Sequence, residues 1–446
     1  MMNTYDRKKL NSLFWRYLSS SILITLSGAL GVIINSVIVG NLVGSDGVSA
    51  INLNSTMIQL LMTISLIIAS GGGMLVGYAL GRKEHDRARY IFTQSTLGSL
   101  TVGIIFALVG VFATEQVASI LSDNEALHGM VSDYLRVVLL GAPAYMLMWG
   151  ISTMISVDGS PRLASLAIVI DNVVNLILDV VFIKFLGMGI EGSSLATVVG
   201  HVVGIAIMLL HFRHANGGRV LSLSSKGGTL AEWKNIISQG APLAVASICL
   251  TLLLFTSNRM VLSAVGREGI FVFSVCMNLL QVYNLFLAGT CRSLQTLGAV
   301  LIGQRNSDGV RFVFGKSLRF ITVAMIATCA YVWIFPSTIA TLFGAEGAEV
   351  VAECNYALRI FAVSFVPFCY IYFVMIVFKL LSFNRMSLFI SLILSLTVIP
   401  VISLMANYAP EYIWYSYLIA YIIEMIAIGV VYKVGRMDVR AKMSSL

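Results

Sequence analysis

The chain has 446 residues, of which 58% are hydrophobic and only 11% are charged. Soluble proteins carry about 25% charged residues, so this composition excludes an ordinary soluble domain and indicates a protein embedded in lipid. The net charge of +8 does not indicate nucleic-acid binding, because the basic residues lie in short patches between apolar runs and form no basic helix face.

Apolar runs long enough to cross a bilayer follow one another along the whole chain. A helix needs about 20 mostly apolar residues to span roughly 30 Å of hydrocarbon. The first run is too long for a cleaved signal peptide and lacks a small-residue cleavage site, so we expect it to remain as a helix. Twelve runs are long enough: 17–42, 50–80, 91–114, 131–155, 162–186, 190–212, 235–265, 270–301, 316–341, 353–381, 386–407 and 411–433. The predicted fold class is an all-α polytopic membrane protein with twelve transmembrane helices.

The longest polar stretch divides these spans into two sets of six. We predict an N-lobe at residues 1–213, a cytoplasmic inter-lobe linker at 214–234 and a C-lobe at 235–446. Most Lys and Arg residues fall on one side of the membrane, which the positive-inside rule makes the cytoplasmic side and which holds both termini. Because each lobe has an even number of spans, the two six-helix bundles are expected to be related by a pseudo-two-fold axis along the membrane normal.

The two halves repeat each other in sequence. Residues 81–95 realign without gaps on residues 303–317. The same offset pairs Gly44 with Gly266, which both follow an apolar run. The repeat indicates a duplicated scaffold of helices and turns.

Three polar residues of the fifth span, Asp171, Asn175 and Asp179, are spaced four residues apart and therefore lie on one helix face. An ionised carboxylate at mid-bilayer costs roughly 2.5–3.5 kcal/mol and normally faces a cavity or a partner. The repeat offset places the two acids on Ile393 and Val401, so the acidic pair occurs in one lobe only. This pattern is typical of a transporter whose ion site lies in one lobe. The plainer alternative is that either acid only caps or pairs near a helix end.

Other polar residues within the spans carry weaker signals. Thr197 and His201 share one face of the sixth span, where a histidine can also be an ordinary satisfied hydrogen bonder. Asn35 is a polar side chain in the apolar core of the first span. The roles of Glu424, an acid deep in the last span, and of Arg292 stay open. The six cysteines, all in the second half and without a CxxC pair, are expected to be inert packing residues.

Four stretches together resemble the multidrug and toxic compound extrusion (MATE) family. Residues 35–44 resemble its first-helix pattern, in which an Asp precedes a VG…G turn, and residues 158–162 resemble the loop before its fifth helix. Residues 175–183 and 187–197 resemble its "NxxLDxxFI … GxxGAAxAT" stretch. The resemblance extends over nearly the whole length, with twelve spans, two six-helix halves and a cytoplasmic linker.

The resemblance implies a cation site in the N-lobe. Archaeal and related bacterial members use a first-helix Asp, the Asn and Asp of the fifth helix and the Thr of the sixth, which match Asn35, Asn175, Asp179 and Thr197 here. Na⁺ is the metal ion expected at Asp179, Asn175 and Thr197. Asn35 departs from the family pattern, because its amide oxygen can ligate a hard cation but cannot be protonated. Acids that other members carry on the seventh and tenth spans are missing as well.

These features predict a secondary active antiporter. We expect it to export amphipathic, cationic organic compounds in exchange for Na⁺ or H⁺ by alternating access, and to need no cofactor besides the coupling ion. Asp171 and His201 are expected to line the substrate cleft, where Met and aromatic side chains adapt to varied cations. We expect a monomer in the plasma membrane (the inner membrane of a bacterial cell) whose partners are the organic substrate and lipid, with no nucleic acid.

Other function classes lack their sequence features. A lipid-linked precursor flippase of the same wider superfamily is the nearest alternative, and it would be expected to show extra spans and a cationic cleft. A membrane-embedded enzyme would need a His, Asp, Glu or Cys cluster at a membrane face, and an ATP-driven pump would need the pattern GxxxxGK[ST]. A channel would need a repeated selectivity-filter segment. The chain shows none of these, so no enzymatic activity is expected.

Overall fold

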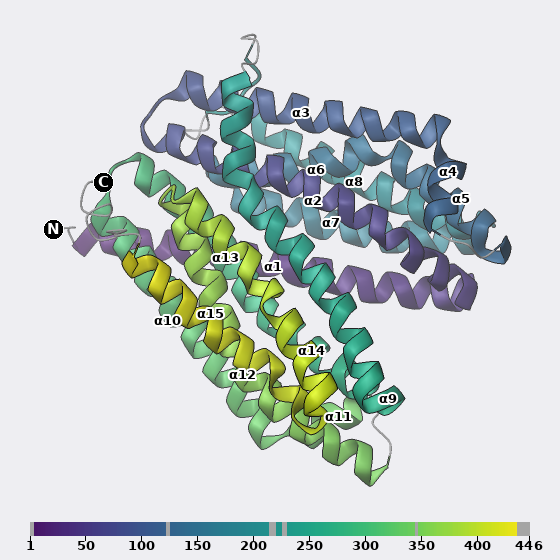
Figure 1. The fold of residues 1–446 in the computed structure, drawn as a ribbon. Coiled ribbons are helices and arrows are strands. Elements are labelled where there is room, and N and C mark those ends of the chain that lie inside the picture. Colours follow the sequence, from purple (N-terminus) through teal and green to yellow (C-terminus); the bar gives the residue numbers. More distant parts are fainter. Residues whose placement is uncertain (1–3, 122–124, 214–219, 225–229, 344–346, 435–446) are drawn as a thin grey trace. The chain divides into compact units, whose positions relative to one another are not determined.

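The part of the chain that the structure describes is helical. The computed structural model describes residues 4–121, 125–213, 220–224, 230–343 and 347–434, and these residues contain no strand (Figure 1). The first half contains α1 (Thr4–Leu42), α2 (Ser45–Gly81), α3 (His85–Phe112), α4 (Thr114–Leu121), α5 (Glu125–Leu140), α6 (Ala142–Val157), α7 (Pro161–Val180), the π turn η1 (Val181–Phe185) and α8 (Gly189–Arg213). The second half contains α9 (Leu230–Gly303), α10 (Ser307–Ile334), α11 (Pro336–Leu342), α12 (Ala348–Leu380), α13 (Asn384–Leu396), α14 (Val398–Tyr408), the 3₁₀ helix η3 (Pro410–Tyr415) and α15 (Ser416–Val434).

The predicted spans are present as helices. Among the described residues, eleven helices are long and apolar enough to cross a bilayer, and a bent pair brings the number to twelve. The bent pair is Leu127–Leu140 with Ala142–Val157, whose axes are bent by 50° relative to each other. The bend has a local cause, because Pro143 has no N–H to donate to the carbonyl of Leu139. The predicted all-α polytopic fold class is confirmed.

The described chain forms two compact units. The N-terminal unit comprises Asn3–Gly240 together with Ala299–Arg305. The C-terminal unit comprises Ala241–Gly298 and Asn306–Leu446. Helix α9 belongs to both units and turns at Gly266, whose backbone has φ 81°. Of the predicted linker, residues 220–224 and the start of α9 are described.

The sequence repeat is also a repeat of backbone conformation. Gly44 and Gly266 both have positive φ, at 99° and 81°. Lys83 and Arg305, another pair in the same register, both lie in the left-handed region, at 61° and 55°. Non-glycine residues adopt that region rarely, so two matched cases indicate the same turn built twice.

A further pair of turns shows that the register of the repeat shifts by one position in the later spans. Gly159 has φ 88° and Ser382 has φ 63°. The residue after each one donates its N–H to the carbonyl five positions earlier, at 2.9 and 2.8 Å. The counterparts of Asp171 and Asp179 are therefore Leu394 and Ile402, each one position beyond the predicted one. Both are buried hydrophobic residues, so the acids still occur in one half only.

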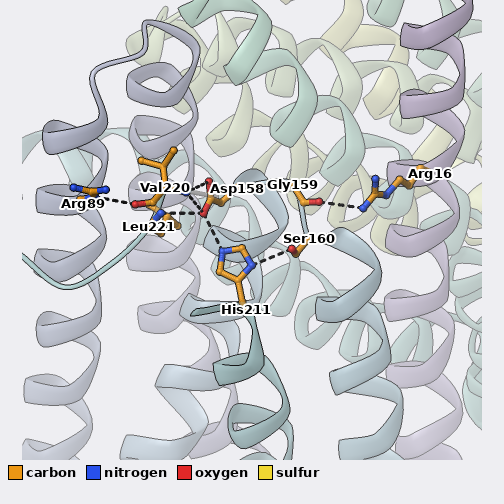
Figure 2. Close-up of polar contacts among 8 residues, drawn as sticks. All are labelled: Arg16, Arg89, Asp158, Gly159, Ser160, His211, Val220 and Leu221. Atoms are coloured by element: carbon orange, nitrogen blue, oxygen red, sulfur yellow. Dashed lines mark hydrogen bonds and ion pairs between the residues drawn. The ribbon is translucent and has the colours of Figure 1, made fainter. Parts of the chain in front are cut away.

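Asp158, in the turn between α6 and α7, attaches residues 220–224 to the N-terminal unit (Figure 2). Its Oδ2 accepts hydrogen bonds from the backbone N–H groups of Val220 and Leu221, each at 3.0 Å. Nε2 of His211 lies 2.9 Å from the same oxygen, and Nδ1 of His211 lies 2.9 Å from Oγ of Ser160. Asp158 and His211 are both buried, so this cluster is a desolvated anchor for the segment.

Two contacts from α3 extend this anchor. Nε of Arg89 donates to the carbonyl of Val220 at 2.9 Å (Figure 2). Oγ1 of Thr93 accepts from the backbone N–H of Ser224 at 2.8 Å. Side chains of α3 thus supply the hydrogen bonds that a segment outside any helix or sheet cannot make with itself.

Candidate cation site in the N-terminal unit

Three polar pairs join α7 to α8 along one shared face. The two helices pack closely against each other and run antiparallel, so positions that rise by four on α7 meet positions that fall by four on α8. The three polar α7 side chains of these pairs are all buried. The pairs are Asp171 with His201, Asn175 with Thr197, and Asp179 with Ser193.

Asp179 and its partner Ser193 are the most deeply buried of these residues, each with 0% of its surface exposed. Its Oδ2 accepts a hydrogen bond from Nδ2 of Asn35 at 2.8 Å, and the Ser193 hydroxyl lies beside the same carboxyl group. Nδ2 of Asn35 also lies 3.3 Å from Oγ of Ser193. Oδ1 of Asp179 has no hydrogen-bond partner among the described residues. One carboxylate oxygen is therefore satisfied by α1, while the other has no donor in the described part of the chain.

Asn175 and Thr197 lie one turn away from this carboxylate. Nδ2 of Asn175 donates to Oγ1 of Thr197 at 3.0 Å, and Oγ1 of Thr197 donates to the carbonyl of Ser193 at 3.1 Å. The structure thus brings Asn35, Asn175, Asp179 and Thr197 to one region of the α1, α7 and α8 packing. The assignment of these four residues to cation coupling stays a prediction.

Asp171 and His201 form a separate pair two turns from Asp179. Nδ1 of His201 lies 3.1 and 3.0 Å from the two carboxylate oxygens of Asp171, which is 5% exposed. The Tyr145 ring meets the imidazole edge-on, with ring centroids 4.9 Å apart. The imidazole is therefore the hydrogen-bonding partner of the buried acid, and the expected place of both residues in a substrate cleft stays a prediction.

The helix geometry changes directly after Asp179. The π turn η1 closes with a hydrogen bond from the Leu186 N–H to the Val181 carbonyl at 3.0 Å. Single π turns inside helices are often found at functional sites, because they rotate the preceding side chains relative to a regular helix.

Ser193 is a site residue that the sequence analysis missed. It lies four positions before Thr197 on α8, which is the spacing that already joined Thr197 to His201. The sequence does not give the register in which α7 packs against α8. That register decides which α8 residue meets Asp179.

The oxygen set suits a hard monovalent cation or a proton. A free carboxylate oxygen, amide groups and hydroxyl groups are ligands of hard cations. A half-turn of the Asn35 amide would present its Oδ1 to a cation at Asp179. Among the described residues there is no group of three or more His, Cys, Asp or Glu that could hold a metal ion. The site is thus built around one carboxylate.

Eleven candidate spans among the described residues, or twelve with the bent pair, an internal duplication and a buried acidic pair on α7 that the second repeat lacks define a polytopic membrane transporter. The model of the MatE family matches residues 20–181 and again residues 242–404, which together exceed half of the chain. The chain therefore belongs to the MatE family, the multidrug and toxic compound extrusion transporters. The starts of the two matches, at positions 20 and 242, are separated by the same interval as Gly44 and Gly266, in agreement with the repeat.

Relatives named as drug exporters align over most of the chain. Multidrug export protein MepA of Staphylococcus saprophyticus subsp. saprophyticus is 26% identical over 330 residues, which cover 74% of this chain and 72% of that protein. Multidrug export protein MepA of Staphylococcus haemolyticus is 24% identical over 333 residues, with the same coverage of both chains.

Solved structures share the fold at lower identity. The outward-facing conformation of a multidrug resistance MATE family transporter of the MOP superfamily has a TM-score of 0.85 and 19% identity, and the match covers 97% of this chain and 96% of that one. A MOP superfamily transporter from Pyrococcus furiosus, described as having a binding pocket of reverse polarity, has a TM-score of 0.84 and 18% identity, with coverages of 96% and 97%. At these identities the likeness shows the fold.

Proposed function

We propose that this protein is a secondary active multidrug efflux transporter, which exports amphipathic organic cations in exchange for Na⁺ or H⁺. Its membership of the MatE family and its MepA relatives, which are named multidrug export proteins, support export of drugs over the flippase alternative. The observation that supports ion coupling is that Asp179 is fully buried and that its Oδ1 has no hydrogen-bond partner in the described part of the chain.

The coupling step follows from the difference in affinity between two states. A buried carboxylate with an unsatisfied oxygen is costly, so a conformation that closes around Asp179 is stabilised when a cation or proton enters. An ion from outside that binds one conformation better shifts the population toward it, and that shift drives release of the substrate. Asn35, Asn175, Thr197 and Ser193 supply the remaining oxygens.

Na⁺ fits Asp179 better than H⁺ does. Asn35 contributes an amide and no second carboxyl group, so the site offers several neutral oxygens for a metal cation and only one group that takes a proton. We place the protein as a monomer in the plasma membrane with both termini in the cytoplasm, since the Lys and Arg distribution favours that orientation.

The test is dye efflux from proteoliposomes of the purified protein loaded with a cationic fluorescent dye, under a Na⁺ gradient or a pH gradient applied separately. We expect Na⁺-driven efflux from the wild type and loss of that efflux in Asp179→Asn. Asp133→Asn, which removes an exposed carboxylate on α5, is the matched control and keeps wild-type efflux. Unchanged Na⁺-driven efflux in Asp179→Asn would exclude this carboxylate as the coupling site.

A further inference from the structure

The C-terminal unit contains a buried acid of its own in the middle of α15. Glu424 is 1% exposed, and neither of its carboxyl oxygens has a hydrogen-bond partner among the described residues. Its span is Pro410–Lys433. Glu424 lies about 14 Å along the helix axis from the Lys433 end of that span and about 20 Å from the other end. The carboxyl group therefore lies deep within the hydrocarbon thickness.

The repeat explains why this acid has no partner. In the register that matches Gly159 with Ser382, α15 corresponds to α8 and Ser416 matches Ser193, and both serines are fully buried. Glu424 then occupies the position of His201. The counterpart of Asp171, the partner of His201, is the buried hydrophobic residue Leu394. The duplication thus keeps a titratable residue at the His201 position and removes the acid that faces it.

The surroundings of Glu424 are mostly apolar. Tyr421, one turn earlier, is buried beside it, and its ring lies 5.5 Å from that of Phe368 on α12. The polar side chain next to Glu424 is that of Thr397, which lies between α13 and α14. The Thr397 hydroxyl donates to the carbonyl of Ile393 at 2.9 Å. A hard metal cation requires several oxygen ligands, and the aromatic rings of Tyr421 and Phe368 are poor ligands for it. A proton needs only the carboxyl group.

In the described part of the chain, the elements packed on α15 bring no cation into contact with Glu424. Helices α12, α13, α14 and η3 pack against α15, and α9 contacts it through Ser257 and Phe273, which both meet Tyr417. Nζ of Lys379 on α12 donates to Oε1 of Gln295 at 3.3 Å, and among the described residues no ion pair joins Glu424 to any cation. Arg385 and Tyr408 lie at opposite ends of the α13–α14 span, and Glu411 lies before the start of α15. Titratable or charged side chains on the helices beside Glu424 include Tyr417, Tyr421, Cys369, Tyr372, Lys379, Cys291 and Arg292, and Arg359, Tyr370 and Lys433 also lie on the same helices.

We propose that Glu424 is a proton-binding site of the C-terminal unit, and that it carries a proton whenever it is enclosed as it is here. An ionised carboxylate in this environment would lack a counter-charge, and the Thr397 hydroxyl beside it already donates to a backbone carbonyl, so the protonated form is strongly favoured. A proton from the outer aqueous phase forms the carboxyl O–H bond, and the bond breaks when a change of conformation lets water reach the group from the other side. This role rests on the proposed antiport and gives the transporter a proton site separate from Asp179.

The first experiment does not depend on transport. Infrared difference spectra of the purified full-length protein in lipid nanodiscs, wild type minus Glu424→Gln, report protonated carboxyl groups through their carbonyl stretch. We expect a protonated-carboxyl band at neutral pH that is lost in Glu424→Gln, is kept in Glu411→Gln and disappears reversibly as the pH is raised. Identical wild-type and Glu424→Gln spectra would overturn the proposal, as would a band that does not respond to pH.

The second experiment tests coupling in the dye-loaded proteoliposomes. Glu424→Gln should reduce efflux driven by the pH gradient to the level of protein-free liposomes, whereas Glu411→Gln should match the wild type. Gln has nearly the shape of a protonated Glu, so a merely structural role predicts unchanged efflux in Glu424→Gln, and that result would overturn the proposal. If Glu424→Gln does not fold, Glu424→Asp keeps a carboxyl group and should retain both the band and part of the efflux. If the wild type exports no dye, the proposed function fails while the infrared result still decides the proton site.

Discussion

Asn35 on α1 donates a hydrogen bond of 2.8 Å from its Nδ2 to Oδ2 of Asp179 on α7, across 144 residues of sequence. The family pattern has a carboxylate at the position of Asn35, and here a neutral donor meets the buried acid instead. The amide stabilises the ionised form of Asp179 by a charge-assisted hydrogen bond, without contributing a titratable group.

Replacing Asn35 with Asp should shift the transporter from Na⁺ toward proton coupling. The substitution places two carboxyl groups within hydrogen-bonding distance, and two such groups share one proton because both cannot be ionised at short range. We expect Na⁺-driven dye efflux to fall by about tenfold, equivalent to about 1.4 kcal/mol, and efflux driven by a pH gradient to rise.

Asn35→Ser is the matched control for this substitution, because it removes the amide without adding a carboxyl group. It should weaken Na⁺-driven efflux and leave the response to a pH gradient unchanged. A pH response equal to that of the wild type in Asn35→Asp would show that the two carboxyl groups do not share a proton.

In the candidate cation site, the face of one helix could be predicted from the sequence, but its partners on the next helix could not. The four-residue spacing of Asp171, Asn175 and Asp179 predicted one buried helix face, and the structure confirms that face. The partners of these residues could not be predicted, because they depend on the register of α7 against α8. Ser193 gave no signal of its own, since serine is common in apolar helices, where it bonds to its own backbone.

In the fold, too, the long spans could be predicted from local sequence, whereas short helices and contacts between distant residues could not. Hydropathy and length placed the spans, because the bilayer requires a minimum apolar length from each one. The short helices α4 and α11 were not predicted, since seven or eight residues are too few for a clear period. The contact of Asp158 with His211 joins residues 53 positions apart, and it depends on how α8 packs beside the turn before α7.

Asp158→Ala should destabilise the N-terminal unit. The substitution leaves the His211 imidazole and the N–H groups of Val220 and Leu221 without their acceptor in a buried place. Each buried donor left without its acceptor costs about 1–3 kcal/mol. Thermal unfolding of the detergent-solubilised protein, followed by intrinsic fluorescence, should show a clearly lower midpoint.

Asp158→Asn keeps one carbonyl acceptor and should fall between the wild type and Asp158→Ala. Arg16→Ala removes a single exposed hydrogen bond to the carbonyl of Gly159 and should change the midpoint little. Equal midpoints for Asp158→Ala and Arg16→Ala would contradict the role of Asp158 as an anchor.

Glu115, on the short helix α4 outside the spans, should contribute stability that disappears at acid pH. The hydrogen bond from the Ser132 hydroxyl at 2.8 Å, followed by that from His128 at 3.1 Å, holds the pKa of the Glu115 carboxyl below its ordinary value of 4.5. A group with a lowered folded-state pKa stabilises the fold above its unfolded-state pKa and loses that contribution as pH falls through the folded-state value.

The wild type should therefore unfold at a slightly higher temperature than Glu115→Gln at neutral pH, and the two curves should converge as the pH falls below 4.5. The difference stays small because the Glu115 side chain is 59% exposed to solvent. Asp133→Asn, on the neighbouring helix α5, is the control and should not reproduce this pH dependence. A gap between wild type and Glu115→Gln that stays constant into acid would contradict the assignment.

Gly81 and Gly303, which are equivalent in the sequence repeat, meet each other backbone to backbone within the N-terminal unit. A Cβ on Gly81 would lie 2.6 Å from the Cα of Gly303, and a Cβ on Gly303 would lie 2.8 Å from the Cα of Gly81. The carbonyls of Val300 and Tyr78 would also clash with these added atoms. The contact is made by backbone atoms, so a rotamer change cannot make room.

Gly81→Ala and Gly303→Ala should therefore each lower the thermal midpoint, at the cost of about 1–3 kcal/mol that is usual for overpacking. Gly315→Ala in α10 is the matched control, because no atom lies within 4 Å of the added Cβ. Alanine also favours a helix over glycine by up to about 1 kcal/mol, so this control should be neutral or stabilising. The double variant Gly81→Ala/Gly303→Ala should cost less than the two single changes together, since one separation of the backbones relieves both clashes. Fully additive costs would show that the two glycines do not share a contact.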